Sequence, residues 1–247
     1  MSNPGDAAPI WARPAPGGRK PAHTRERIAA AALEVADLEG VEAVTMRRVA
    51  TALGAGTMTL YHYVRNKREL TALMDDAMMA ELIIPEEELA GDWREGLAEI
   101  ARRSYATFLR HPWLFDHFNA EEAPEPGGPN ALRHMEQSLA AAALTGLPIV
   151  EQMELVSLVD DYVWGHAMRA RTVRREEDVG EARIAAMLAY LEAMLATGEF
   201  PHLSAFAGDD PRASFESLAE LWRDSERFER GLQALLDGIE LRVGRAT

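Results

Sequence analysis

Apolar residues recur at helical spacing along most of the chain. The first clear run falls between positions 24 and 40 and is carried by Ile28, Ala31, Val35 and Leu38. Intervals of three and four residues place such side chains on one face of a helix. Thr24 precedes the run and Gly40 ends it, and these residue types suit the N-cap and the C-terminal end of a helix. The pattern predicts an amphipathic helix here.

Three further helices are predicted before residue 83. Thr45 begins the second, which ends at Gly54. After the short turn 54–56, Thr57 is expected to cap a third helix that is too brief to be a core element by itself. Asn66 with Glu69 three residues later resembles a capping box and starts the fourth. The first three helices with the short turn predict a helix-turn-helix, and the fourth is expected to link it to the rest of the chain.

The remaining sequence alternates between helical runs and breaks. The predicted helices are 93–109, 130–144, 149–173, 182–195 and 228–243. The breaks, which are rich in Gly and Pro or in charge, are 120–130, 174–181 and 198–211. No alternation of apolar and polar residues that would predict a strand is sustained beyond a few positions. The predicted fold class is therefore all-α, with an N-terminal three-helix helix-turn-helix domain and a larger helical domain.

Three regions are distinguished. Residues 1–22 are rich in Pro, Gly and Ala and are expected to form a flexible N-terminal arm. Within it, Trp11 either rests on the folded part or belongs to a tail whose Arg13, Arg19 and Lys20 reach along DNA. Residues 23–70 form the predicted helix-turn-helix domain, called the head. Residues 71–247 form the larger helical domain, called the body.

Charge is distributed unevenly over these regions. The net charge of −14 argues against nucleic acid binding at first sight. Residues 1–70, however, hold ten Lys or Arg against seven Asp or Glu, a net charge of +3. Residues 71–247 hold 16 against 33, a net charge of −17. Positions 45–68 carry five basic residues and no acidic one, a local excess typical of a surface that contacts phosphate.

Composition excludes several classes of protein. The chain has no cysteine, so disulfides, thiol nucleophiles and cysteine-ligated zinc are excluded. It has no long uncharged apolar run and no secretory signal, so we expect a cytoplasmic protein that does not contact a membrane. Motifs of metalloproteases, serine hydrolases and nucleotide-binding enzymes are absent. We therefore expect no enzyme, no catalytic residue, no cofactor and no bound metal.

The segment from Thr24 to about Leu82 closely resembles the DNA-binding domain of the tetracycline-repressor family. The resemblance is carried by Thr45-Met46-Arg47-Arg48-Val49-Ala50, Leu53-Gly54, Thr59-Leu60-Tyr61-His62-Tyr63 and Asn66-Lys67-Arg68-Glu69-Leu70. It implies that Arg47 contacts a base, that Thr57, Met58, Thr59 and His62 face the major groove, and that Tyr61, Tyr63 and Lys67 contact phosphates. Because a short recognition helix makes few base contacts, we expect a homodimer on a near-palindromic operator in double-stranded DNA.

The body has a weaker resemblance to the regulatory domain of the same family, through Trp93-Arg94, the segment 110–113 and the segment 228–243. In that family the domain dimerises and holds an effector pocket, so the resemblance implies that residues 71–247 are the helical regulatory and dimerisation domain, which binds the effector ligand. The apolar stripe of the last helix is expected to pair with the helix around 155–168, either across a dimer axis or within one chain. Polar and aromatic residues among these helices are the candidates for binding an apolar or aromatic effector: Trp113, His117, Phe118, His134, Asp161, Tyr162, Trp164 and His166.

The expected function is a sequence-specific transcriptional regulator, a repressor that a small-molecule effector releases from its operator. Two alternatives remain open from the sequence. One is a regulator or activator that acts without a small ligand. The other is a recombinase-like enzyme with an accessory helix-turn-helix, which predicts a strand or metal-site signature in the body, and the sequence shows neither.

Overall fold

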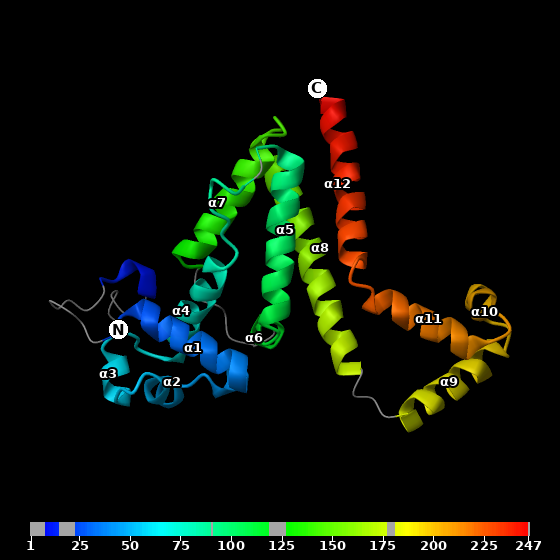
Figure 1. Ribbon diagram of the computed structural model, residues 1–247, viewed down its shortest axis with the longest axis horizontal. Coiled ribbons are helices and arrows are strands. Elements are labelled where there is room, and N and C mark those ends of the chain that lie inside the picture. Colours follow the sequence, from blue (N-terminus) through cyan, green and yellow to red (C-terminus); the bar gives the residue numbers. More distant parts are fainter. Residues whose placement is uncertain (1–7, 15–22, 90, 119–126, 177–180, 247) are drawn as a thin grey trace, which may run out of the picture.

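The computed structural model describes residues 8–14, 23–89, 91–118, 127–176 and 181–246. Within these ranges the regular structure is entirely helical, which confirms the predicted all-α class. Figure 1 shows the head on one side of the molecule and the long helices of the body rising beside it. Among the described residues, no helix is long and apolar enough to cross a membrane.

The head is built from α1 (Arg25–Glu39), α2 (Met46–Ala52) and α3 (Thr57–Tyr61), with the short 3-10 helix η3 (Val41–Ala43) after α1. Helix α4 (Lys67–Ala80) runs from the head into the body. Side-chain oxygens of Thr24, Thr45 and Asn66 accept hydrogen bonds from backbone N–H groups three residues later, at 3.3, 3.2 and 2.9 Å. These bonds confirm three predicted N-caps. Thr57 was predicted to be the N-cap of α3, but Gly56 holds that position and Thr57 is the first residue of the helix.

Two glycines set the turns between the head helices. Gly40 ends α1 with a φ of 86°, and Gly54 follows α2 with a φ of 64°. Both angles lie in the left-handed region, which residues with a Cβ rarely adopt. The turn after α2 is closed by a hydrogen bond of 2.9 Å from the Ala55 N–H to the Ala50 carbonyl. The conformation of Gly54 and this hydrogen bond therefore set the direction of α3 relative to α2.

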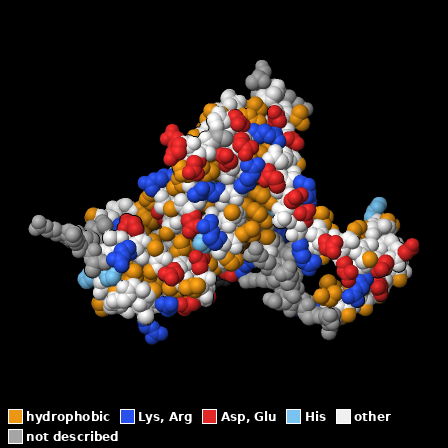
Figure 2. Space-filling view, viewed as in Figure 1, with side chains coloured by type: hydrophobic (Ala, Val, Ile, Leu, Met, Phe, Trp, Pro, Cys, Tyr) orange, Lys and Arg blue, Asp and Glu red, His pale blue; other side chains and the backbone are white. Residues whose placement is uncertain are grey.

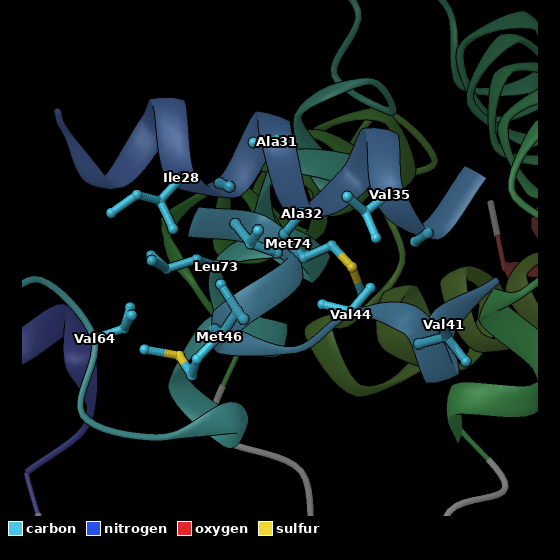
Figure 3. Close-up of a cluster of buried hydrophobic side chains, with 14 of the residues drawn as sticks. Ile28, Ala31, Ala32, Val35, Val41, Val44, Met46, Val64, Leu73 and Met74 are labelled. Carbon is cyan, nitrogen blue, oxygen red and sulfur yellow. The ribbon is translucent and has the colours of Figure 1, made fainter. Parts of the chain in front are cut away.

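The core of the head lies between α1 and α4. Figure 3 shows Ile28, Ala32 and Val35 of α1 facing Leu73 and Met74 of α4. Val49 of α2 and Leu60 of α3 are also fully buried in this cluster. Since Leu60 is the one buried residue of α3, it anchors that helix. Trp113 and Leu114 of the body join the same cluster, so the core is continuous across the boundary between head and body.

Residues 8–14 correct the expectation of a flexible arm. They include a short 3-10 helix, η2 (Ile10–Ala12), and Ile10 is fully buried in the head core. Arg25 donates hydrogen bonds to the carbonyls of Ile10 and Arg13, at 3.0 and 2.9 Å. Burying an isoleucine side chain contributes roughly 1.5–3 kcal/mol, which explains why this part of the arm is docked. The rest of the expected arm, with Arg19 and Lys20, lies outside the described residues.

The body contains α5 to α12. Their bounds are α5 (Trp93–Arg110), α6 (Leu114–Phe118), α7 (Pro129–Ala143), α8 (Ile149–Glu176), α9 (Glu181–Leu195), α10 (Pro201–Ala207), α11 (Pro211–Arg223) and α12 (Arg227–Ala246). The five helices predicted downstream of residue 92 correspond to α5, α7, α8, α9 and α12. Three helices were not predicted: α6, α11, and α10, which lies in the predicted break 198–211. Helices α9 to α11, called the α9–α11 extension, project from the bundle (Figure 1).

The apolar stripe of α12 is buried within the chain. Phe228, Leu232, Leu236 and Ile239 pack in one cluster with residues of α5 and α8. Of the two readings that the sequence left open, the intrachain core accounts for these residues, and they are not available to pair across a dimer axis. The physical reason is that α5 also covers the stripe, because its Leu97 and Ile100 belong to the same cluster.

Candidate nucleic-acid interface and ligand pocket

Helix α3 is anchored on one side and exposed on the other. Leu60 fixes it to the head, while Met58 is 75% exposed and Tyr61 and His62 also lie in solvent. Thr57 and Thr59 are partly buried. Because a five-residue helix contributes little to a core, the outward face of α3, with Met58, Tyr61 and His62, is open to contact by another molecule.

Basic residues border this surface. Arg47 lies in the first turn of α2 and Lys67 is the first residue of α4, and both are exposed. Tyr63, in the turn before α4, is partly buried and packs against the head core. The sequence-predicted DNA contacts are therefore on α2, on α3 or between α3 and the start of α4. Exposed cations beside an exposed short helix suit the phosphate backbone on both sides of a major groove.

Arg48, the neighbour of Arg47, has a different role. Its Nε donates to the two carboxylate oxygens of Glu39 at 2.9 and 3.1 Å. This hydrogen-bonded pair raises the pKa of Arg48 and lowers the pKa of Glu39. Arg48 thus ties α2 to the end of α1, whereas Arg47 is directed to solvent.

Glu69, the acidic residue that directly follows the basic segment 45–68, is paired with a cation. Glu69 is 5% exposed, forms an ion pair of 2.5 Å with Arg13, and accepts a hydrogen bond from the Arg65 N–H at 2.7 Å. The pairing holds Arg13 against α4, so this residue does not reach along DNA as one reading of the arm proposed. Trp11 packs against the head core, which agrees with the other reading. Within residues 45–69, the exposed charged side chains are therefore all basic.

The candidate ligand residues fall into separate groups. Trp113, His117 and Trp164 lie at α6: Trp113 directly precedes it, His117 belongs to it, and Trp164 of α8 contacts it. The Trp113 Nε1–H donates to Asp37 of α1 at 2.7 Å, and His117 Nε2 lies 3.0 Å from an Asp75 oxygen of α4. The hydrogen bond to Asp75 raises the pKa of His117. Trp164 contacts the Phe115 ring at a centroid distance of 4.7 Å.

A second group fills the space between α5, α8 and α12. The Tyr162 hydroxyl donates to the Phe228 carbonyl at 2.7 Å, and the His166 ring lies 5.0 Å from the Tyr162 ring. Tyr105 stacks on Phe228 at 4.0 Å. Burial lowers the pKa of His166. These rings pack on one another, and Tyr105, Tyr162 and Phe228 also belong to the hydrophobic cluster of the body. Their binding of an effector stays a prediction.

The last candidates are scattered. Asp161 is exposed on α8, and the side chain of Phe118 lies outside the described residues. His134 on α7 is 9% exposed, its Nδ1 is buried without a hydrogen-bond partner, and burial lowers its pKa. Ser104 on α5 is 3% exposed and its hydroxyl is also without a partner. Sequence reasoning missed Ser104, although a serine among the apolar positions of an amphipathic helix was a visible signal.

Metal binding has no support in the described residues. They contain no group of three His, Asp or Glu side chains placed to hold an ion. The sequence prediction that the protein holds no metal and no cofactor stays a prediction.

Both halves of the chain match models of one protein family. Residues 28–74 match the model described as bacterial regulatory proteins, tetR family. Residues 84–243 match the model described as tetracyclin repressor-like, C-terminal domain. The first match covers most of α1, all of α2 and α3 and about the first half of α4, and the second covers nearly the whole body.

Relatives and solved structures agree with these matches. A helix-turn-helix transcriptional repressor of Streptomyces coeruleorubidus is 34% identical over 92% of this chain and 81% of its own length. A helix-turn-helix transcriptional regulator of Saccharopolyspora erythraea is 31% identical over 95% of this chain and 92% of its own length. The crystal structure of apo ActR from Streptomyces coelicolor superimposes with a TM-score of 0.63 at 27% identity, covering 92% of this chain and all of that one. ActR in complex with actinorhodin gives a TM-score of 0.63 at 26% identity, over 91% of this chain and 99% of that one.

The helix-turn-helix geometry, the exposed α3 and the match of both halves lead to one conclusion. This chain belongs to the tetracycline-repressor (TetR) family of DNA-binding transcriptional regulators.

Proposed function

We propose that the protein is a homodimeric repressor that binds a near-palindromic operator through two copies of α3 and leaves it when a small aromatic molecule enters the body. The observation that carries the proposal is the exposed face of α3, bordered by Arg47 and Lys67. The exposed Met58 and the threonines beside it match the methyl groups and hydrogen-bonding edges of base pairs in the major groove.

The length of α3 argues for two heads. Five residues at 1.5 Å each span about 7.5 Å, the height of roughly two base pairs at 3.4 Å per step. Two base pairs recur too often in a genome to define an operator. Two heads related by two-fold symmetry read two inverted half-sites, about one helical turn or a multiple of it apart.

The dimer surface is proposed on the outer faces of α8 and α12. Val150 and Met153 of α8 and Leu241 of α12 are large apolar side chains in solvent. Ala234 and Gly238 of α12 are also exposed, and a Cβ at Gly238 would meet no atom beyond its own helix backbone within 4 Å, so no large side chain occupies these two positions. The small residues let a partner helix approach closely, and the large apolar side chains become buried when the dimer forms. The α9–α11 extension also exposes apolar side chains beside acidic ones (Figure 2) and is available to contact a partner chain.

The effector is proposed to bond the buried polar groups of α5 and α7. Leaving a buried donor or acceptor unsatisfied costs about 1–3 kcal/mol, and both Ser104 Oγ and His134 Nδ1 are in that state. A ligand that carries a hydroxyl or carbonyl on an aromatic frame satisfies them. ActR was solved with actinorhodin bound, so actinorhodin is the first probe of this site. To release DNA, it must bind more tightly to the conformation that does not fit the operator.

Selection from random double-stranded oligonucleotides tests the DNA part. Purified full-length protein should enrich an inverted repeat, and light scattering should give a dimer. Met58→Ala should change the selected bases, while Leu132→Ala, an exposed residue of α7, should not. Enrichment of a single half-site by a monomer would contradict the proposal.

Release by actinorhodin tests the effector part. Adding it to the protein–operator complex should lower operator affinity, and His134→Ala should require more actinorhodin for the same release. Leu132→Ala again serves as the control. If saturating actinorhodin leaves the affinity of a competent DNA-binding protein unchanged, the effector part is wrong and the DNA part stands.

A further inference from the structure

A cleft of about 370 Å³ lies where the head meets the body. It is formed by the end of α1, the end of α5, the loop to α6, α6 itself and α8. Among its lining residues are Asp37, Phe108, Trp113, Phe115, Asp116 and Arg171. The volume is within the range of small-molecule pockets. His134 and Ser104, the proposed effector contacts, do not line it.

The cleft combines aromatic walls with one cation, Arg171, and two carboxylates that already have partners: Asp37 contacts Trp113 and His111, and Asp116 pairs with Arg171. Phe108, Trp113 and Phe115 supply rings. The guanidinium of Arg171 lies 5.9 Å from the centroid of the Phe115 ring and forms an ion pair with Asp116. The Arg171 side chain is only 15% exposed, whereas that of Asp116 is 49% exposed. A guanidinium has five N–H donors, so Arg171 can hold Asp116 and a second anion at once, in surroundings with little competing water.

The wall of the cleft is also the polar joint between head and body. Asp37 of α1 accepts the Trp113 indole N–H at 2.7 Å and lies 2.6 Å from His111 Nδ1. The other ring nitrogen of His111 lies 3.2 Å from Glu81, just after α4. His111 is 2% exposed. A molecule in the cleft therefore touches both sides of the joint that sets the position of α1 against α6.

We propose that this cleft is a second ligand site, which takes a flat aromatic molecule bearing a carboxylate. The ring lies among Phe108, Trp113 and Phe115, and the carboxylate bonds Arg171. Because Ala36, Asp37 and Gly40, at the end of α1, also line the cleft, the bound molecule bridges head and body and restrains α1. Only the regulatory consequence of this restraint, a change in operator affinity, rests on the proposed function.

The probe is 2-naphthoate, with neutral 2-naphthamide as its matched analogue. In a ligand-observed NMR titration of the full-length protein, 2-naphthoate should bind in the high micromolar to millimolar range expected of a small fragment, and 2-naphthamide should bind more weakly. Arg171→Met should weaken 2-naphthoate about tenfold, the loss of a charge-assisted hydrogen bond. Arg169→Met, the same change on an exposed face of α8, should leave its affinity unchanged.

Hydrogen exchange of the wild-type protein locates the molecule without any variant. Saturating 2-naphthoate should slow exchange of the amides of residues 36–40 and 113–116. Equal affinity of 2-naphthoate for Arg171→Met and wild type, or protection confined to α7 around His134, would overturn the second site. Operator binding without 2-naphthoate is measured in parallel, so failure of the cleft is distinguished from failure of DNA recognition.

Discussion

Replacing each of two adjacent arginines by alanine should have different effects. Arg47 is exposed beside α3, whereas Arg48 is held by Glu39 at 2.9 and 3.1 Å. If Arg47 contacts a base, Arg47→Ala loses about 1–3 kcal/mol in each half-site. Two copies give about 2–6 kcal/mol, a loss of roughly 30-fold to 20,000-fold in operator affinity. Arg48→Ala should cause a small loss of stability and leave base preference unchanged.

Lys67 separates backbone contacts from base contacts. It is the first residue of α4, where its charge and the N-terminal amides favour a phosphate rather than a base edge. Each lost phosphate contact lowers the slope of log affinity against log salt by about 0.9, so Lys67→Ala should lower it by roughly two per dimer. The same variant should weaken all operator sequences alike.

The assay is fluorescence anisotropy with the selected operator and its single-base variants at four salt concentrations, for wild type and the three alanine variants. Arg47→Ala should lose discrimination at one base pair of each half-site with little change in salt slope. The assignment of roles fails if Arg47→Ala weakens all operators equally and Lys67→Ala alters base preference. A large change in base preference for Arg48→Ala would equally contradict it.

Three further predictions concern stability and assembly. The hydrogen bond to Asp75 raises the pKa of His117 above 6.5, so this pair stabilises the fold fully below about pH 6.5, and the stabilisation is lost as pH rises through the raised pKa. His117→Gln should remove this component from the pH dependence of the unfolding free energy. An identical pH profile for the variant and the wild type would show that the pair contributes nothing. Ile10→Ala should lower the unfolding free energy by about 2–5 kcal/mol in denaturant titrations, because Ile10 is fully buried; a change below 0.5 kcal/mol would mean that residues 8–14 detach at no cost. Gly238→Arg should shift the dimer to monomer in light scattering with little change in the melting temperature of the monomer, and a dimer as stable as wild type would place the interface elsewhere.

The local features of the fold were predictable from sequence because their causes are local. An N-cap joins residues three apart, and the caps at Thr24, Thr45 and Asn66 were all found where expected. Helix α6 was missed because five residues carry no periodicity. Helices α10 and α11 were missed because Gly and Pro marked a break, yet Pro201 and Pro211 occupy first-turn positions, where proline is well tolerated.

The long-range features were not predictable. The joint between Asp37 and His111 links residues 74 positions apart, and nothing in either local sequence identifies the partner. The stripe of α12 was read correctly as apolar, but periodicity does not say whether α5 or a second chain covers it. Candidate ligand residues were chosen for being aromatic or polar among apolar neighbours. That criterion does not separate Tyr162, which is satisfied by the Phe228 carbonyl, from His134, whose Nδ1 has no partner.

The central claim is that two copies of α3 lie in two major-groove half-sites. Because the chain has no cysteine, Met58→Cys provides a single attachment point for an iron–EDTA group that cleaves DNA nearby. With the selected operator, cleavage should appear in two symmetry-related clusters whose centres are one helical turn, about 10 base pairs, or a multiple of it apart. The same group on Leu132→Cys, an exposed site on α7, should give little cleavage. One cluster, or equal cleavage from both positions, would contradict the account.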